Sequence, residues 1–185
     1  MPVRSRCSVL VLMAACLVPC TLRADELQDI EKLYRSGELQ QALQRADAAI
    51  AAEPRAAQIR FLKGVVLTDL KRTAEATQVF VALTQEYPEL ADPYNNLAVL
   101  YAADGQLQSA LTALQTALRN DPAHRAAREN LGDVYLALAL QAWSAASAVA
   151  KGDDAVLGRK LRLAREIQAL PAAAIPPAAS PRTPG

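Results

Sequence analysis

The sequence predicts an all-α fold built from repeated helical hairpins. Apolar residues recur every three or four positions through most of the chain, which is the spacing of amphipathic helices. Ala and Leu dominate the composition and aromatic residues make up only 4%, which suits helices packed through small side chains and argues against a sheet. The helical pattern also returns at a fixed interval of about 34 residues, a period typical of a repeat array.

The clearest hairpin lies in residues 91–124. Two amphipathic stretches are separated by Gly105, which can adopt the left-handed conformation that ends a helix. Ala98 and Ala110 are small where two antiparallel helices must approach closely. Pro122 then stands where the first turn of the next helix would begin. These residues predict a helix, a tight turn and a second helix that packs on the first.

Several sets of positions keep this interval: Ala42, Ala76 and Ala110; Pro54, Pro88 and Pro122; Gly64, Ala98 and Gly132; Leu33, Leu67, Tyr101 and Tyr135. This pattern resembles the tetratricopeptide repeat, and the resemblance covers roughly residues 23–137. Within residues 91–124 the signature places are filled by Tyr94, Leu97, Ala98, Tyr101, Gly105, Ala110, Leu114, Ala117 and Pro122. The resemblance implies a right-handed α-solenoid whose concave side is lined by the first helix of each repeat.

The expected elements follow from this register. We expect helices near residues 24–36, 39–52, 56–70, 73–87, 92–103, 107–120, 123–150 and 154–170. They divide a repeat domain at 25–170 into repeats at about 23–56, 57–90 and 91–124, a partial repeat at 125–150 and a capping helix at 154–170. The remaining residues, 171–185, are rich in Pro and Ala, and such composition predicts a disordered tail.

Two positions of the second repeat carry local expectations. Gly64 lies in the middle of a helix, where Gly costs about 1 kcal/mol relative to Ala. The repeat register supplies a compensation, because a side chain there would push the partner helix away. Lys71 stands where the neighbouring repeats have Gly. A left-handed Lys is unfavourable by roughly 1 kcal/mol, so we expect this turn to differ in shape.

The fourth repeat begins like the others but contains no turn. Gly132 and Tyr135 occupy their usual places, yet no Gly, Asn or Asp follows where the turn belongs. We therefore predict one long helix, with a bend near residues 138–141 as the alternative. Trp143 is the only tryptophan and is expected to seal the core.

The last helix is expected to cap the solenoid. Gly152 and Asp154 mark a stop and a new start. The residues expected to face inward are Val156, Leu157, Leu161, Ala164, Ile167 and Leu170. Those expected to face outward are Arg159, Lys160, Arg162 and Arg165. An ordinary solvated face is the favoured interpretation of this basic side, and contact with anionic lipid is the alternative.

Residues 1–24 have the features of a secretory signal peptide. Arg4 and Arg6 precede an apolar run of ten residues, which is too short to span a bilayer. Cleavage after Ala24 would place the protein in the periplasm or outside the cell, and an uncleaved N-terminal anchor is the alternative.

The three cysteines all fall in this leader. A chain that starts at Asp25 therefore needs no disulfide. A third possibility is a lipoprotein, because Met13-Ala14-Ala15-Cys16 is similar to a bacterial processing site at which Cys16 would be lipidated. In that case the mature protein would be anchored to a membrane.

The sequence offers little for catalysis. His124 is the only histidine, and its position at a helix start predicts a solvent-exposed role. No metal cluster can be built from one His without a mature Cys. No Gly-rich phosphate loop or nucleophile elbow appears, and the net charge of +1 argues against a nucleic-acid-binding patch. We expect no enzyme activity, no catalytic residue, no metal and no cofactor.

A binding groove is the remaining functional hypothesis. The partner-binding residues that we place on the concave side are Phe61, Val65, Asn95, Asn96, Val99, Glu129, Asn130 and Asp133. Asn side chains donate and accept hydrogen bonds together, as an extended peptide backbone requires. Local capping beside Asp92-Pro93 is the equal alternative for Asn95 and Asn96.

The resemblance also bears on the ligand. Asn96 occupies the place of an asparagine in the carboxylate-clamp members of the family. Leu27 and Glu31 stand where that clamp has Lys and Asn, and Ala126 and Asn130 stand where it has basic residues. A neutral or basic protein segment is therefore expected. The two open functions are an envelope adaptor that binds a partner in the groove and a structural subunit docked by its convex face or last helix.

Overall fold

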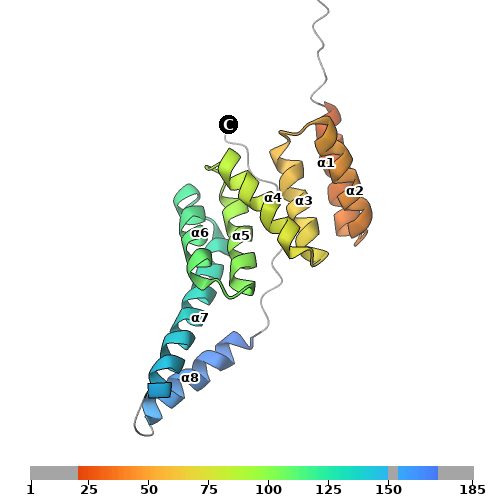
Figure 1. Cartoon of the computed structure of the whole chain (residues 1–185). Coiled ribbons are helices and arrows are strands. Elements are labelled where there is room, and N and C mark those ends of the chain that lie inside the picture. Colours follow the sequence, from red (N-terminus) through yellow and green to blue (C-terminus); the bar gives the residue numbers. More distant parts are fainter. Residues whose placement is uncertain (1–20, 150–153, 171–185) are drawn as a thin grey trace, which may run out of the picture.

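The computed structural model describes residues 21–149 and 154–170, and every regular element in these ranges is a helix (Figure 1). The helices are α1 (Thr21–Arg35), α2 (Leu39–Ala52), α3 (Ala57–Asp69), α4 (Thr73–Glu86), α5 (Ala91–Ala103), α6 (Leu107–Asn120), α7 (Arg125–Val149) and α8 (Ala155–Gln168). The predicted all-α solenoid is confirmed. The leader up to residue 20, the stop at 151–153 and the tail at 171–185 lie outside the described residues.

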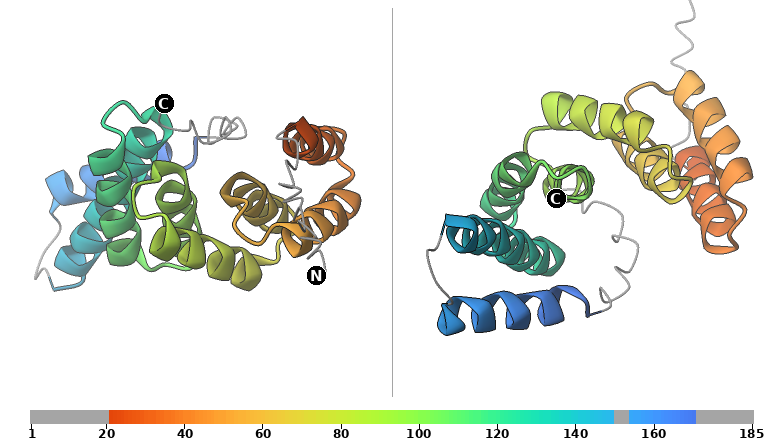
Figure 2. Two further views of the ribbon diagram at one scale, coloured as in Figure 1. Left: turned by 90° about the horizontal axis from the view of Figure 1, so that it is seen from above. Right: turned by 60° about the horizontal axis from the view of Figure 1, so that its bottom comes forward.

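The helices pair as the repeat register requires. Each helix contacts the next one along the chain, so that α1–α2, α3–α4 and α5–α6 form the three hairpins. First helices of adjacent repeats also touch, α1 with α3 and α5 with α7. Figure 2 shows the hairpins following one another along an arc. This stacking brings residues one repeat apart next to each other.

Each of the three hairpin turns has a residue with a left-handed backbone conformation at the same position of the repeat. Gly37 and Gly105 have φ angles of 80° and 74°, and Lys71 has a φ angle of 61°. The prediction that the turn at Lys71 differs in shape is wrong. Arg72 donates its backbone N–H to Leu67 O at 2.9 Å, and the corresponding bond closes each of the other two turns. The packing of α3 against α4 fixes the turn, and Lys71 carries the strain.

Gly64 lies where two helices approach closely. A Cβ atom added there would meet a ring carbon of Phe80 at 2.7 Å, and Phe80 is fully buried. The expectation that a side chain would push the partner helix away is therefore confirmed. At Gly132, the equivalent residue two repeats later, an added Cβ would meet no atom within 4 Å. The difference arises because α7 does not turn back at this level, so no second helix lies over Gly132.

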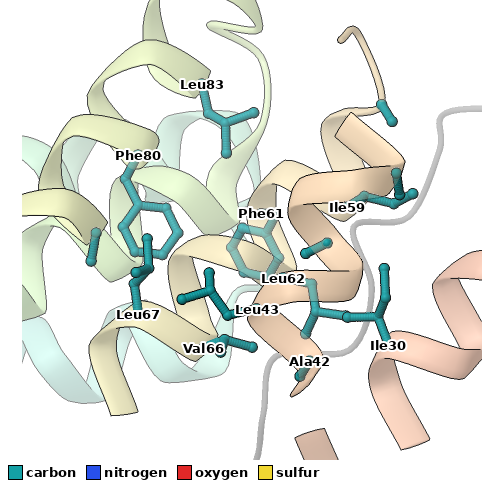
Figure 3. Packing of buried hydrophobic residues seen from close by; sticks show 14 of the residues in the cluster. Ile30, Ala42, Leu43, Ile59, Phe61, Leu62, Val66, Leu67, Phe80 and Leu83 are labelled. Carbon is teal, nitrogen blue, oxygen red and sulfur yellow. The ribbon is translucent and has the colours of Figure 1, made fainter. Parts of the chain in front are cut away.

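The core is continuous through the first two repeats and narrows toward α8. Figure 3 shows Phe61 and Phe80 at its centre, with their ring centroids 5.8 Å apart. A second cluster joins α5, α6 and the start of α7 around Ala110 and Leu114, which are fully buried. A small third cluster, built on Leu140, joins α7 to α8. Stability therefore rests mainly on the three complete hairpins.

Helix α7 is unbroken and has 25 residues, compared with 13 in α3. The predicted long helix is confirmed, and the alternative bend at 138–141 is wrong. Trp143 is partly buried and packs against the cluster between α7 and α8. The Lys160 ammonium lies 5.8 Å from the centre of the Trp143 ring, a distance at which a cation and an aromatic face attract each other.

Helix α8 begins as the sequence predicts. The Asp154 carboxylate accepts hydrogen bonds from the backbone N–H groups of Val156 at 3.0 Å and Leu157 at 2.9 Å. Such a cap satisfies donors that the helix start leaves without partners. None of the described helices is long and apolar enough to cross a membrane.

The predicted inward face of α8 is only half correct. Leu161 and Ala164 are buried against α7, and Leu157 is partly buried. Val156, Ile167 and Leu170 were also expected to face inward, but they are 66%, 55% and 66% exposed. The physical reason is that α8 packs on a single helix, which covers one narrow side of it.

Candidate interaction surface

One row of side chains at the same register lies accessible on three successive first helices. Val65 on α3, Val99 on α5 and Asp133 on α7 follow each other at the repeat interval. Val65 and Val99 are partly buried and Asp133 is exposed. This row, which we call the groove row, retains contact surface for a partner after the solenoid has folded.

The neighbouring row behaves differently. Phe61, Asn95 and Glu129 also keep the repeat interval, but Phe61 is 3% exposed and Asn95 is 4% exposed. Phe61 packs on Phe80 of α4. The placement of Phe61 and Asn95 on an open groove is thereby corrected, because neighbouring helices cover both side chains. Glu129 is exposed, since α7 is the last first helix of the array.

Asn95 and Asn130 form a hydrogen bond between repeats. The Asn130 Nδ2 group donates to Asn95 Oδ1 at 2.8 Å and so joins α7 to α5. Asn95 is the one buried polar residue of the described chain. A polar group at that depth needs its partner, so the pair fixes the spacing between the two first helices.

Tyr34 and Asp69 make a second bond of this kind, between α1 and α3. The Tyr34 hydroxyl donates to Asp69 Oδ2 at 2.7 Å, and the two residues are 35 positions apart, as are Asn95 and Asn130. Burial, and then the hydrogen bond to Asp69, raise the pKa of Tyr34 to about 12. Both bonds lie between the first helices of adjacent repeats. We call these two pairs the inter-repeat bonds.

Asn96 is held within its own helix. Its Nδ2 group donates to the backbone O of Asp92, one turn earlier in α5, at 2.9 Å. This is the local role that the sequence left open beside groove binding. The side chain is partly buried, and its Oδ1 atom is the part that could accept a hydrogen bond from a partner.

His124 takes part in a third contact between repeats. Its Nε2 lies 3.0 Å from Asp92 Oδ1, and its Nδ1 accepts the backbone N–H of Ala127 at 3.2 Å. The side chain is only 11% exposed, so the expected solvent-exposed role is wrong. The hydrogen bond to Asp92 raises the pKa of His124. Both residues stand at the starts of successive first helices, a signal that the sequence contained but that the sequence-based prediction missed.

The described residues show no group of three or more His, Cys, Asp or Glu side chains that could hold a metal ion. A depression of about 550 Å³ lies on α8 and not on the groove row, lined by Gly158, Leu161, Arg162, Arg165, Glu166 and Ala169. The lining carries two arginines and one glutamate, whereas the charged residue of the groove row is Asp133. The two surfaces therefore suit ligands of opposite charge.

Comparison with known proteins identifies the repeat. The family described as tetratricopeptide repeat matches residues 31–91 and 95–180. A search of the curated proteins finds no match. Among solved structures, the first TPR of Spaghetti (RPAP3) bound to the HSP90 peptide SRMEEVD is 17% identical with a TM-score of 0.61, over 66% of this chain and 97% of that one.

Two further similarities extend the comparison. MamA 41-end from Desulfovibrio magneticus RS-1 is 22% identical with a TM-score of 0.57, over 79% of this chain and 75% of that one. YrrB, described as a TPR protein with an unusual peptide-binding site, is 25% identical with a TM-score of 0.54, over 58% of this chain and 55% of that one. At these identities the likenesses support the fold.

Proposed function

The chain belongs to the tetratricopeptide repeat family, and we propose that it is a non-catalytic adaptor or scaffold of the cell envelope that binds a protein segment along its concave side. Folds of this family serve protein interaction, and two of the similar structures hold peptides of HSP90 and HSP70. The envelope assignment rests on the signal-like leader of the sequence.

The groove row is the observation that carries this proposal. Val65, Val99 and Asp133 lie on successive first helices, and each retains access to solvent in the folded chain. A row of this kind spans three repeats, which suits an extended segment lying across them. The inter-repeat bonds hold α1 against α3 and α5 against α7, so the α5 and α7 part of the surface is organised before a partner arrives and less freedom is lost there on binding.

The expected partner is neutral or basic. Glu129 and Asp133 are exposed at the α7 end of the surface. The RPAP3 structures contain the acidic peptides SRMEEVD and SGPTIEEVD. Here Leu27 and Ala126 stand where a carboxylate clamp has basic residues, so nothing at these positions compensates an acidic tail. A segment with Lys or Arg opposite Asp133 suits the charge.

A single charge reversal tests the proposal. Asp133→Lys should abolish or weaken by about tenfold the recovery of the partner from an envelope extract, because attraction becomes repulsion. Glu89→Lys is the matched control, since Glu89 is an exposed acidic residue in the connection between α4 and α5. Equal recovery with both variants would reject the groove as the binding surface.

A second pair of variants separates binding from folding. Asn96→Ala should weaken the partner by about 0.5–1.5 kcal/mol if Oδ1 accepts a bond from it, with little effect on stability. Ala110→Leu should destabilise the fold by about 1–3 kcal/mol, because Ala110 is fully buried between α5 and α6. If Asn96→Ala melts the protein like Ala110→Leu and leaves the affinity of folded molecules unchanged, Asn96 has only its capping role.

Export is tested separately. Cells are fractionated and the N-terminus of the recovered protein is sequenced. A new N-terminus at Asp25 supports cleavage, and a lipid-modified Cys16 supports the anchored form. Intact Met1 on protein from the cytoplasm would remove the envelope from the proposal and leave the groove untouched.

A structural subunit of a larger envelope complex is the second candidate, docked by the convex face or the C-terminal helix. Docking by the C-terminal helix would bury the exposed apolar side chains of α8, which a bilayer would also bury. A fixed partner that co-purifies equally with the wild type and with Asp133→Lys would support this function over the adaptor.

A further inference from the structure

Helix α8 carries a second apolar face that nothing in the described chain covers. Its members are Val156, Leu163 and Ile167, with Leu170 just past the helix end, and they are 66%, 49%, 55% and 66% exposed. They are separated by seven, four and three residues, so they lie on one side of the helix. We call this set the α8 stripe.

The α8 stripe is separate from the face that holds α8 to the protein. Leu161 and Ala164 are buried against α7. Because successive residues of a helix are rotated by about 100°, Leu163 lies roughly opposite Leu161. Ile167 lies only about 60° from Ala164 on the helical wheel, so the stripe adjoins the face that packs on α7, and its exposure shows that α7 leaves it available.

Basic residues flank the stripe on both sides. On the helical wheel Arg159 and Lys160 lie about 50° to either side of its centre, and Arg162 and Arg165 follow beyond Arg159. Glu166, the single acidic residue of α8, lies on the same side about 70° from the centre, between Arg159 and Arg162. The helices before α8 contain more acidic than basic residues, so the positive charge is concentrated at this end of the protein.

We propose that the α8 stripe docks on the surface of an anionic bilayer, with its aliphatic side chains among the upper acyl chains and Arg159 at the phosphate level. An apolar side flanked by Lys and Arg, in a helix of low overall hydrophobicity, is the pattern of an interfacial helix. Long basic side chains can keep their charge at the headgroups while their stems lie against apolar surface. This inference does not depend on the groove.

The shape of the stripe favours a bilayer over other occupants. It is the outer side of one helix and forms no groove between two helices, which is the site that an amphipathic peptide helix commonly occupies. A second copy docked stripe to stripe would bring the two sets of basic residues together, which is repulsive. Anionic headgroups, by contrast, surround an embedded helix and match the charge of Arg159, while the Lys160 ammonium lies over the Trp143 ring of α7.

Binding to vesicles tests the proposal with the full-length chain. The probes are vesicles of phosphatidylglycerol and phosphatidylcholine, and vesicles of phosphatidylcholine alone. We expect Leu163→Ser/Ile167→Ser to weaken binding to the anionic vesicles at least about tenfold, because two embedded aliphatic chains are lost. Arg159→Glu should weaken the same binding by about tenfold and leave binding to neutral vesicles unchanged.

Tyr135→Ser is the matched control. Tyr135 lies on α7 and is 50% exposed, against 49% for Leu163, so Tyr135→Ser is matched to the single variant Leu163→Ser, which is measured beside the double variant. Binding by Tyr135→Ser should equal that of the wild type within about twofold, because it removes no embedded side chain. Circular dichroism of each variant checks that the helices remain. Equal vesicle binding by the stripe variant and Tyr135→Ser would overturn the proposal.

A local readout separates α8 from the apolar leader, which all variants share. Trp143 is the only tryptophan, so Trp143→Phe/Ile167→Trp places the sole indole on the stripe. Lipids brominated in the upper acyl chain should quench this indole in anionic vesicles. If the protein binds the vesicles but its indole is not quenched, the stripe does not enter the bilayer and the proposal is overturned.

Discussion

The amide of Asn130 on α7 donates a hydrogen bond of 2.8 Å to Asn95 Oδ1 on α5, where Asn95 is only 4% exposed. Tyr34 and Asp69 make the same kind of connection between α1 and α3. Solenoids are held together mainly by apolar contacts between neighbouring repeats. Here two polar bonds at a shared spacing add direction to those contacts and set the register of α1 with α3 and of α5 with α7.

Removing the outer partner of the buried pair should destabilise the protein. Asn130→Ala leaves Asn95 without its partner inside the fold, and the expected loss is about 1–3 kcal/mol in the free energy of unfolding. Urea denaturation measures it. In a double-mutant cycle with Asn95→Ala, the second change should cost much less in the background of the first. Additive losses would show that the two side chains do not interact.

Two glycines at the same repeat position should respond to alanine with opposite signs. Gly64→Ala brings a Cβ to 2.7 Å from the buried Phe80 ring, and we expect a loss of about 1–3 kcal/mol. Gly132→Ala meets no atom within 4 Å, so the better helix propensity of Ala should stabilise by about 1 kcal/mol. Thermal unfolding of the two variants gives the comparison.

A smaller side chain at position 80 provides the control for the clash between a Cβ atom at position 64 and the Phe80 ring. Phe80→Leu is itself destabilising because Phe80 is fully buried, but Gly64→Ala should cost less in the Phe80→Leu background than in the wild type, since the far end of the ring is then absent. An equal cost in both backgrounds would mean that Gly64 is required for a reason other than its contact with Phe80.

Lys71 should be replaceable by the residue that its neighbours use. Its φ angle of 61° is strained for a residue with a Cβ, and relief of that strain is worth about 1 kcal/mol before the added freedom of Gly in the unfolded chain is subtracted. We expect Lys71→Gly to stabilise by up to about 1 kcal/mol. Gly105→Ala, the reverse change at the equivalent turn, should destabilise the protein in the same urea titration.

The contact between Asp92 and His124 should make stability depend on pH. The pKa of His124 is raised in the folded chain by Asp92. Its contribution is therefore fully present below the unfolded pKa, about 6.5, and is lost as the pH rises through the folded pKa. Protonation at Nδ1 also gives up the bond from the Ala127 N–H, so the net effect should be modest.

Urea midpoints at about pH 5.5 and about pH 8.5 measure this effect. Asp92→Asn should lower the urea midpoint more at the acidic pH than at the basic pH. In a His124→Gln background, Asp92→Asn should lower the midpoint equally at both pH values. An NMR titration of the single imidazole checks the direction of the pKa shift. A folded pKa below that of an unfolded peptide would contradict the prediction.

The features that could be predicted from the sequence are those that depend on a local pattern of residues. Helix periods and turn residues placed the helices, the absence of a turn signal predicted the unbroken α7, and Asp154 was recognised as a cap. Gly64 was understood because the repeat register shows where two helices must meet. These features are written in short stretches of chain or in a strict interval.

The failures share a different cause, which is the dependence of burial on neighbouring helices. The repeat interval shows that Phe61, Asn95 and Glu129 are equivalent, but not that only Glu129 remains uncovered. The apolar residues of α8 predicted burial, whereas α7 covers only one side of it. Propensity disfavoured a left-handed Lys71, and tertiary packing overrode it. In a repeat protein, the exposure of individual site residues is therefore harder to predict from the sequence than the order of the helices.

The length of α7 has a consequence for how this protein can change by duplication. With 25 residues against 13 in α3, α7 is longer by about 18 Å of helix at 1.5 Å per residue. A copied repeat inserted before α7 would meet the stacking surface that every earlier hairpin meets. A repeat copied to a position after α8 would have to stack on α8, which lies farther along the axis of α7 than the second helix of a complete hairpin would lie. Duplication can therefore lengthen this array from within, while its C-terminal end keeps the same helix and the same exposed stripe.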